Sequence, residues 1–231
     1  MAVTADTRAG TRAGVEAFEL YRFFHAGDSE TLALRGVSLR VAAGEMVALL
    51  GASGSGKSTL LNCLAGLDEP DGGHVDLLGE RLTRRPEAQR ARRRGASVGI
   101  LMQAHNLMPT LRLADNMALA MQLAGKTDRA RAGRLFEQLG LAGHVSARPA
   151  QLSGGEVARA GLAIALAASP QVLLADEPTG EVDAATEALV LAVFNEQRAA
   201  GTAILIATHS EALAAHADRV VRMRDGKVVD V

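Results

Sequence analysis

The chain has 231 residues, of which 48% are hydrophobic and 22% are charged, and its formal net charge is −1. This composition predicts a globular chain with a substantial core, and it excludes a disordered or fibrous protein. The near-zero net charge also excludes a global electric field that would draw the chain to nucleic acid or to an anionic membrane. The single cysteine, Cys63, excludes an internal disulfide framework and fits a reducing compartment.

No segment of the sequence is suited to crossing a membrane. The most apolar stretch, residues 160–175, is interrupted by Ser169, Pro170 and Gln171, and it falls short of the roughly 18 apolar residues that a membrane helix needs. The opening residues MAVTADTRAGTRAGVE contain arginines, but no apolar segment follows them. We therefore expect a tail over residues 1–14, no signal peptide, and a chain that remains in the cytoplasm.

The first half of the chain has mainly strand patterns. Residues 15–24 and 32–41 are rich in β-formers and flank a polar turn, which predicts an N-terminal antiparallel sheet. The apolar run MVALL at residues 46–50 predicts a buried parallel strand, and the glycine-rich loop after it leads into a helix. We expect a hairpin or edge strand at VDLLGERL, then the charged helix EAQRARRRG and the strand SVGILM.

The second half begins with helical patterns and then returns to buried strands. Apolar residues recur at helical spacing between residues 104 and 150, and QLSGGE starts a further helix that we expect to run to about Ser169. The runs VLLA and AILIA predict buried strands, and VVRM and KVV predict a hairpin. These patterns predict an α/β fold with a mainly parallel sheet core, an N-terminal antiparallel β subdomain and an inserted helical lobe at about residues 104–168.

The segment GASGSGKST at residues 51–59 matches the full phosphate-loop pattern GxxxxGK[ST], and it lies between a predicted strand and a predicted helix. Its glycines allow backbone N–H groups to cradle phosphate, Lys57 is expected to reach the β- and γ-phosphates of ATP, and Ser58 offers a hydroxyl to Mg²⁺. A flexible glycine turn beside a surface lysine is the structural alternative. The predicted nucleotide ligands are Gly51, Ser53, Gly54, Ser55, Gly56, Lys57, Ser58 and Thr59.

Two carboxylates, Asp176 and Glu177, follow the buried strand VLLA. Charge at the end of an apolar strand is costly unless a cation or a reacting water justifies it, although a solvated strand end is the ordinary alternative. We expect Asp176 to hold Mg²⁺ directly or indirectly, and Glu177 to act as the general base for attack on the γ-phosphate. These two motifs predict a P-loop nucleotidase, and they leave kinases, GTPases and helicases open.

A third motif, LSGGE at residues 152–156, narrows the choice among the classes of P-loop nucleotidase. At a helix start, Ser153, Gly154 and Gly155 form a second anion-binding surface, although such a glycine-rich start is often merely structural. The phosphate loop is already expected to bind the phosphates of the nucleotide held by its own subunit. A second phosphate-binding surface therefore implies a second subunit. The motif resembles the signature of the ABC ATPases, in which the signature of one subunit closes over ATP held by the other. The resemblance implies a head-to-tail dimer.

Further positions match landmarks of the same family. Gln103, after the strand SVGILM, resembles the Q-loop glutamine, which implies contact with Mg²⁺ and with the γ-phosphate. The stretch HNLMPTLRLADN after it resembles the part of the family that faces the membrane subunit. His209 in ATHS resembles the switch histidine, which contacts the γ-phosphate and orients the catalytic water. Asp183 resembles the D-loop aspartate of the dimer seam, but Val182 stands where the family usually has leucine.

The adenine-stacking aromatic of the family is matched less distinctly. Phe24 is the candidate, although the family more often has tyrosine, and Phe23 and Tyr21 are neighbouring alternatives.

The resemblance covers residues 18–229, and within the family it is strongest to the ATPases of lipoprotein-release, macrolide-export and cell-division complexes. It implies a single ABC ATPase domain over residues 15–231 that binds and hydrolyses ATP with Mg²⁺. Its implied partners are a second copy and a separate integral membrane subunit at the inner face of the cell membrane. The implied work is export, lipoprotein release or mechanotransmission.

Two alternatives remain. A soluble ABC protein of ribosomes or DNA would usually carry two cassettes, a coiled coil or zinc insertions, and a small-molecule kinase would leave LSGGE and His209 without a role. The arginine-rich run at residues 81–94 has no interleaved aromatic residues, so we expect a solvated or partner-facing surface there and no nucleic acid.

Overall fold

The N-terminal part of the chain forms a four-stranded antiparallel sheet in the computed structural model, which describes residues 12–26, 29–180 and 182–230. The strand order is β2-β1-β4-β5, with β1 at Ala13–Ala26, β2 at Ser29–Ala42, β4 at Gly72–Leu77 and β5 at Glu80–Arg81. The predicted antiparallel β subdomain is therefore confirmed.

The strand β1 begins inside the segment expected to be a tail, at Ala13. Gly14 allows this, because a Cβ added there would lie only 2.3 Å from the Cβ of Ala203. A residue with a side chain would keep β1 away from the second sheet. The remainder of the expected tail, residues 1–11, lies outside the described residues.

The second sheet has the strand order β10-β9-β3-β8-β7-β6. Its strands are β3 at Met46–Leu50, β6 at Val98–Leu101, β7 at Val172–Asp176, β8 at Ala203–Thr208, β9 at Arg219–Arg224 and β10 at Lys227–Asp230. All neighbours are parallel except β9 and β10. Every residue of β3, β7 and β8 is buried, as the continuous apolar runs predicted. The predicted α/β class is confirmed.

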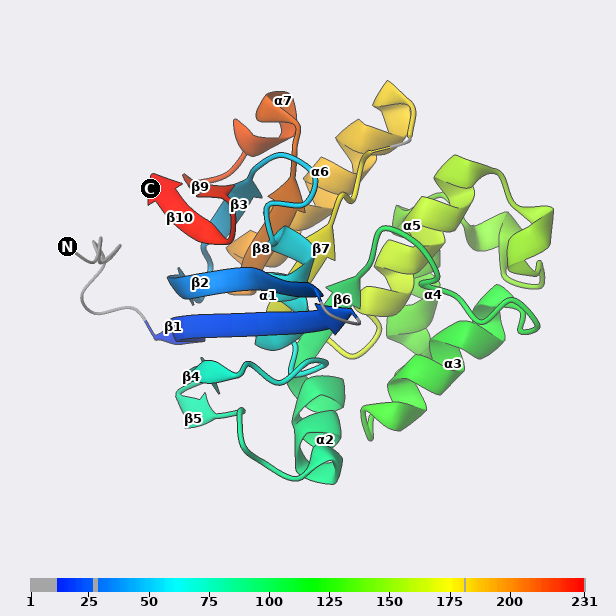
Figure 1. The fold of residues 1–231 in the computed structure, drawn as a ribbon. Coiled ribbons are helices and arrows are strands. Elements are labelled where there is room, and N and C mark those ends of the chain that lie inside the picture. The colour runs from blue at the N-terminus through cyan, green and yellow to red at the C-terminus, as the bar shows by residue number, and fades with distance from the viewer. Residues whose placement is uncertain (1–11, 27–28, 181, 231) are drawn as a thin grey trace.

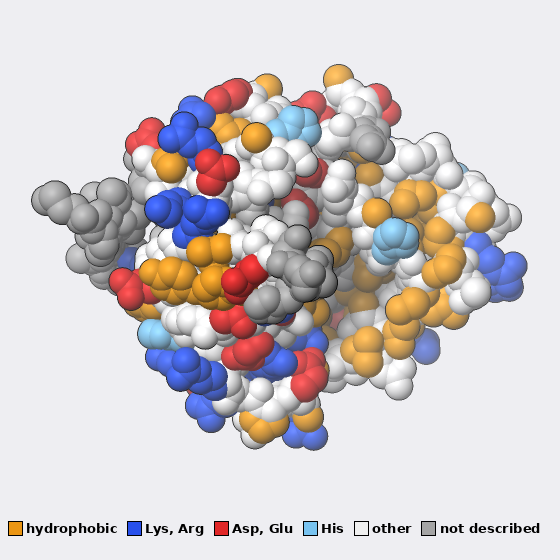
Figure 2. Space-filling view, in the orientation of Figure 1, with side chains coloured by type: hydrophobic (Ala, Val, Ile, Leu, Met, Phe, Trp, Pro, Cys, Tyr) orange, Lys and Arg blue, Asp and Glu red, His pale blue; other side chains and the backbone are white. Residues whose placement is uncertain are grey.

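The helices lie on both sides of the second sheet and in a separate lobe (Figure 1). They are α1 at Lys57–Leu64, α2 at Glu87–Ser97, α3 at Leu113–Leu123, α4 at Arg129–Gln138, α5 at Gly154–Ala165, α6 at Ala184–Ala199 and α7 at Glu211–Ala214, with 3₁₀ turns at Ala142–His144 and Pro149–Gln151. The helices α3, α4 and α5 form the lobe, over which hydrophobic side chains gather on the surface (Figure 2).

The helix α5 ends earlier than expected. Its last residue is Ala165, whereas the sequence pattern suggested about Ser169. Ser169 has a φ of 49°, outside the helical region, and Pro170 follows it. A proline disfavours helical backbone in the residue before it, so the apolar composition of this stretch could not extend the helix.

The helix α1 is held between the two sheets. Leu60, Cys63 and Leu64 are fully buried, in a core that includes residues of β1, β2, β3 and β8. Burial raises the pKa of the Cys63 thiol to about 12, so this thiol packs and does not react at neutral pH. A second core lies between the helical lobe, α6 and the other face of the parallel sheet. Across the described ranges, no helix is long and apolar enough to cross a membrane.

Candidate functional site

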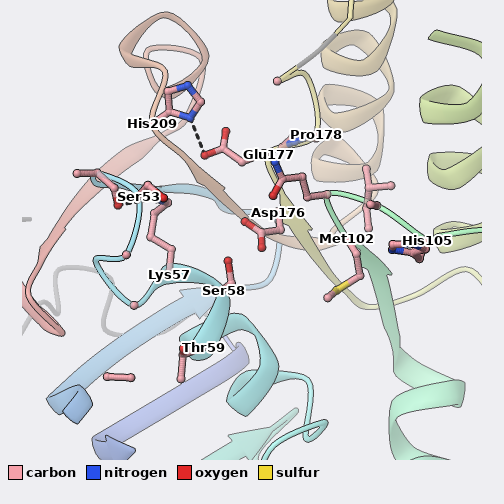
Figure 3. Close-up of a pocket in the computed structure, with 18 of the residues that line it drawn as sticks. Ser53, Lys57, Ser58, Thr59, Met102, His105, Asp176, Glu177, Pro178 and His209 are labelled. Atoms are coloured by element: carbon pink, nitrogen blue, oxygen red, sulfur yellow. Dashed lines mark hydrogen bonds and ion pairs between the residues drawn. The ribbon is translucent and has the colours of Figure 1, made fainter. Parts of the chain in front are cut away.

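A cavity of about 1360 Å³ opens beside the carboxyl ends of the parallel strands (Figure 3). Its walls come from both sheets, from the loop before α1 and from the lobe helix α5. Most of the predicted site residues line it, namely Phe24, Ser53, Gly54, Gly56, Lys57, Ser58, Thr59, Gln103, Gly154, Asp176, Glu177 and His209. Tertiary structure thus gathers residues from six separate segments of the chain.

The phosphate loop connects β3 to α1, as its sequence predicted. Lys57 is only 7% exposed, and its Nζ donates hydrogen bonds to the carbonyl oxygens of Gly51 at 2.7 Å and Ala52 at 3.1 Å. Gly56 has a φ of 102°, and a Cβ there would lie 2.5 Å from the Ala33 carbonyl oxygen. Only glycine fits this position, so the loop must curl with its backbone toward the cavity.

Features of the loop fit an anionic ligand. The Ser55 Oγ is buried and has no hydrogen-bond partner among the described residues. The start of α1 has no side-chain cap, so the first N–H groups of the helix carry no internal acceptor. Orphaned donors together with the partial positive charge of a helix N-terminus are suited to phosphate.

The acidic pair lies at the end of β7. Asp176 is 6% exposed and occupies the last position of the strand, while Glu177 leaves the strand with a φ of 47°. This left-handed backbone is unusual for a residue other than glycine, and such strain often marks functional sites. It turns the Glu177 side chain toward the end of the neighbouring strand β8 (Figure 3).

Two residues of the β8 end hold the Glu177 carboxylate. Thr208 Oγ1 donates to Oε2 at 3.0 Å, and His209 Nδ1 lies 2.8 Å from Oε1 (Figure 3). Because the ionised carboxylate only accepts, the Nδ1 atom of His209 carries the hydrogen, which leaves Nε2 as an acceptor in the neutral ring. The Glu177 side chain is 12% exposed and that of His209 is 67% exposed. The histidine therefore lies between the carboxylate and the solvent.

The loop after β6 contributes the predicted Gln103, which is exposed and lines the cavity. Asn106 closes this loop, because its Oδ1 accepts from Met102 N at 2.7 Å and its Nδ2 donates to Met102 O at 2.6 Å. Neither Asn106 nor Thr208 was among the predicted site residues. An asparagine five residues after the end of β6 and a threonine directly before the predicted histidine were the available signals.

The start of α5 has the predicted cap. Ser153 Oγ donates to Glu156 Oε2 at 2.9 Å, and the Ser153 amide donates to the same oxygen at 2.8 Å. The hydrogen bond from this amide holds the pKa of Glu156 below its ordinary value. His144 Nε2 lies 3.2 Å from the other carboxylate oxygen. The helix start is therefore well ordered by its own side chains.

Several predicted residues do not line the cavity of their own chain. They are Gly51 and Ser55, which lie within the phosphate loop, and Ser153, Gly155 and Asp183, which lie at the starts of α5 and α6. Asp183 caps α6 by accepting from Thr186 N at 2.8 Å, and this bond lowers the pKa of Asp183. Arg159 NH1 donates to Thr186 Oγ1 at 2.8 Å and so joins the two helix starts.

Of the three aromatic residues considered for base stacking, only Phe24 lines the cavity. Its side chain is 42% exposed. Tyr21 lies against the glycines of neighbouring strands, since a Cβ at Gly36 would lie 2.8 Å from the Tyr21 hydroxyl oxygen. The structure therefore favours Phe24 over its neighbours as the aromatic wall of the site.

Sequence comparisons agree with these motifs. The ABC transporter family matches residues 34–180. The lipoprotein-releasing system ATP-binding protein LolD of Acinetobacter baylyi is 40% identical over 94% of this chain and 97% of its own length. The macrolide export ATP-binding/permease protein MacB of Chromobacterium violaceum is 41% identical over 94% of this chain. The chain spans only 34% of the length of that relative.

Solved structures give the same result for the fold. A dimeric bacterial ABC transporter cassette, MJ0796, has a TM-score of 0.89 at 28% identity, over 94% of this chain and 97% of its own. The same cassette in a post-hydrolysis state bound to ADP and Pi gives the same values.

Proposed function

Because this chain belongs to the ABC transporter family, we propose that it binds and hydrolyses ATP as a subunit of a transporter-type complex. The observation that carries this proposal is the convergence of the buried Lys57, the acidic pair of buried Asp176 and partly buried Glu177, and a histidine on one cavity. We assign residues 15–231 to a single ABC ATPase domain with a helical lobe at about 104–168.

The triphosphate of ATP is assigned to the loop before α1. Ser53, Gly54, Ser55 and Gly56 would offer N–H groups, Thr59 would add a polar side chain, and Lys57 would exchange its two carbonyl contacts for phosphate oxygens. Mg²⁺ would be held by Ser58, Gln103 and Asp176, whose oxygens suit this ion, and when bound it neutralises charge on the phosphate.

Glu177 is the residue that we assign to proton transfer. Its carboxylate is held at both oxygens by Thr208 and His209, and it faces the cavity from the end of a rigid strand. It would accept a proton from the attacking water, while the Nε2 acceptor of His209 would help orient that water. Phe24 is assigned to the adenine base.

The second half of each site would come from a second copy of the chain in a head-to-tail dimer. Ser153, Gly155 and Asp183 cap or begin helices yet do not line their own cavity. Backbone N–H groups at a helix start favour anions, so the start of α5 is suited to the phosphates of an ATP molecule held by a partner, and Asp183 is assigned to the dimer seam. The dimeric state of the similar cassette supports this arrangement.

A complementation experiment tests the head-to-tail arrangement. We expect Lys57→Met and Ser153→Arg each to abolish ATP hydrolysis, and an equimolar mixture to recover about a quarter of the wild-type rate. Half of the dimers in the mixture are mixed, and each mixed dimer has one site with both defects and one with neither. Phosphate release is the measurement. Mixed dimers that form but stay inactive would contradict the proposal, because sites built within one chain cannot complement.

The partner that receives the motion is proposed to be a separate integral membrane subunit. Met108, in the loop before α3, is 56% exposed, and Leu123, the last residue of α3, is 73% exposed. Hydrophobic side chains also gather on the surface over the helical lobe (Figure 2). The printed names of the relatives include a lipoprotein-releasing system and permease proteins. We place the chain in the cytoplasm, at the inner face of the membrane.

Nucleic acid is the less favoured partner. The arginines of the 81–94 run are largely neutralised, since Arg81 pairs with Asp76, Arg90 with Glu69, Arg93 with Glu80 and Arg94 with Glu87. Few positive charges remain for phosphate contacts.

Detergent purification of the tagged native complex distinguishes these partners. We expect two copies of the chain for each membrane assembly, retained at high salt. Recovery with ribosomes or DNA and without any integral membrane protein would favour the alternative.

A further inference from the structure

The Phe24 ring has a fixed neighbour on one of its faces. Arg22 lies two residues earlier on β1, and its guanidinium carbon is 4.8 Å from the centroid of the ring. Residues two apart on a strand share a face, which explains the contact. The guanidinium thus covers one side of an aromatic ring that lines the nucleotide cavity.

Arg22 is itself held by two carboxylates. Its Nε and NH2 donate to the two oxygens of Asp68 at 2.8 and 2.9 Å, and its NH1 donates to Asp71 at 3.0 Å. The arginine and Asp68 side chains are 21% and 25% exposed. A forked pair of this kind fixes orientation as well as charge. The arginine is therefore already neutralised, and it is poorly placed to serve as a phosphate ligand.

The carboxylates belong to the segment that leaves the phosphate-loop helix. The amides of Leu67 and Asp68 both donate to the carbonyl oxygen of Asn62 in α1, at 2.9 and 3.2 Å. Asp71 also accepts from the Phe23 amide at 2.8 Å. A continuous path of short contacts therefore runs from α1, which begins at Lys57, through Asp68 and Arg22 to Phe24.

We propose that Arg22 is a positioning residue for nucleobase binding: held by Asp68 and Asp71, it fixes the Phe24 ring so that the opposite face is free to stack on adenine. This inference rests on the proposed function. A half-exposed phenylalanine without such a neighbour would change rotamer freely. The conformational entropy lost on ordering its ring would then weaken the binding of the nucleotide. The contacts through Asp68 also connect Phe24 to the phosphate-loop helix. The surface for the adenine base and the surface for the phosphates are therefore held at a fixed position relative to each other.

Steady-state kinetics of Arg22→Met test the proposal. Methionine keeps the length of the side chain but removes the charge and the fork. We expect the KM for ATP to rise about three- to tenfold with kcat unchanged. Inorganic tripolyphosphate, which lacks the base, should inhibit the variant and the wild type with the same inhibition constant. Arg22→Lys should recover part of the loss, because it restores the cation without the fork.

The matched control is Arg40→Met. Arg40 lies on the neighbouring strand β2 and pairs with Glu16 at 3.1 Å, with side-chain exposures of 23% and 24%, and it does not line the cavity. This variant should leave the KM for ATP unchanged. In a Phe24→Ala background, Arg22→Met should add nothing further, because its effect passes through the ring.

Three results would overturn the inference. They are an unchanged KM for ATP in Arg22→Met, an equal weakening of ATP and tripolyphosphate, and an additive loss in the double variant. If Arg22→Met does not fold, Arg22→Lys tests the loss of the fork alone, and we then expect a smaller rise in the KM for ATP than for Arg22→Met, again with an unchanged inhibition constant for tripolyphosphate. A rise in KM for Phe24→Ala alone would leave the proposed function standing without this inference. A wild-type chain that neither binds nor hydrolyses ATP would instead remove the proposed function itself.

Discussion

Replacing Glu177 by glutamine is expected to slow ATP hydrolysis by at least about a hundredfold, since a positioned general base contributes about 10²- to 10⁴-fold. Glutamine has nearly the same shape, and its oxygen can still accept from Thr208 or His209. The fold should therefore survive, while the ability to take a proton from water is lost. ATP binding does not need this proton transfer, so the variant should accumulate as an ATP-bound dimer.

Phosphate release and size-exclusion chromatography with ATP measure these two effects of Glu177→Gln. The control is Glu211→Gln, which removes a carboxylate of α7, the helix that follows β8, outside the cavity. The Glu211 side chain is 69% exposed and pairs with Arg222. The Glu211→Gln variant should hydrolyse ATP at the wild-type rate. A Glu177→Gln variant that also does so would refute the assigned role.

Replacing Lys57 by methionine is expected to weaken ATP binding by about 2–5 kcal/mol, the usual cost of removing one partner from a buried charged pair. Lys57 is 7% exposed at the start of α1, so little water is available there to compensate for a missing cation. In the chain without ligand, the change removes only two hydrogen bonds to loop carbonyls and leaves an apolar side chain in a buried position.

Calorimetry with Mg·ATP and denaturant unfolding measure the effects of Lys57→Met. The free energy of unfolding should remain close to the wild-type value, which separates lost binding from lost folding. Lys227→Met, an exposed change on β10, is the control and should bind ATP normally. Wild-type affinity in the Lys57 variant would contradict the assignment of this lysine to phosphate.

Local sequence patterns were sufficient for the buried strands and for the cap of α5. Five consecutive apolar residues at Met46–Leu50 and the glycine loop after them depend only on neighbouring residues, and the structure has the predicted strand, loop and helix there. The serine cap of α5 was also predicted, because capping acts over three residues. The ends of the predicted helices and strands were less accurate. The end of α5 was misplaced because a positive φ at Ser169 outweighed helical composition.

By itself, the sequence determined the α/β class, the motifs from which the site was predicted and the resemblance to the ABC ATPases, because local patterns and short contiguous motifs are sufficient for each. Tertiary structure alone decided which groups meet. The pairing of β7 with β8 brings Thr208 and His209 to Glu177, and the pairing of β1 with β4 brings Arg22 to Asp68. The physical reason is that strand order and register depend on packing of the whole core, between residues far apart in the chain.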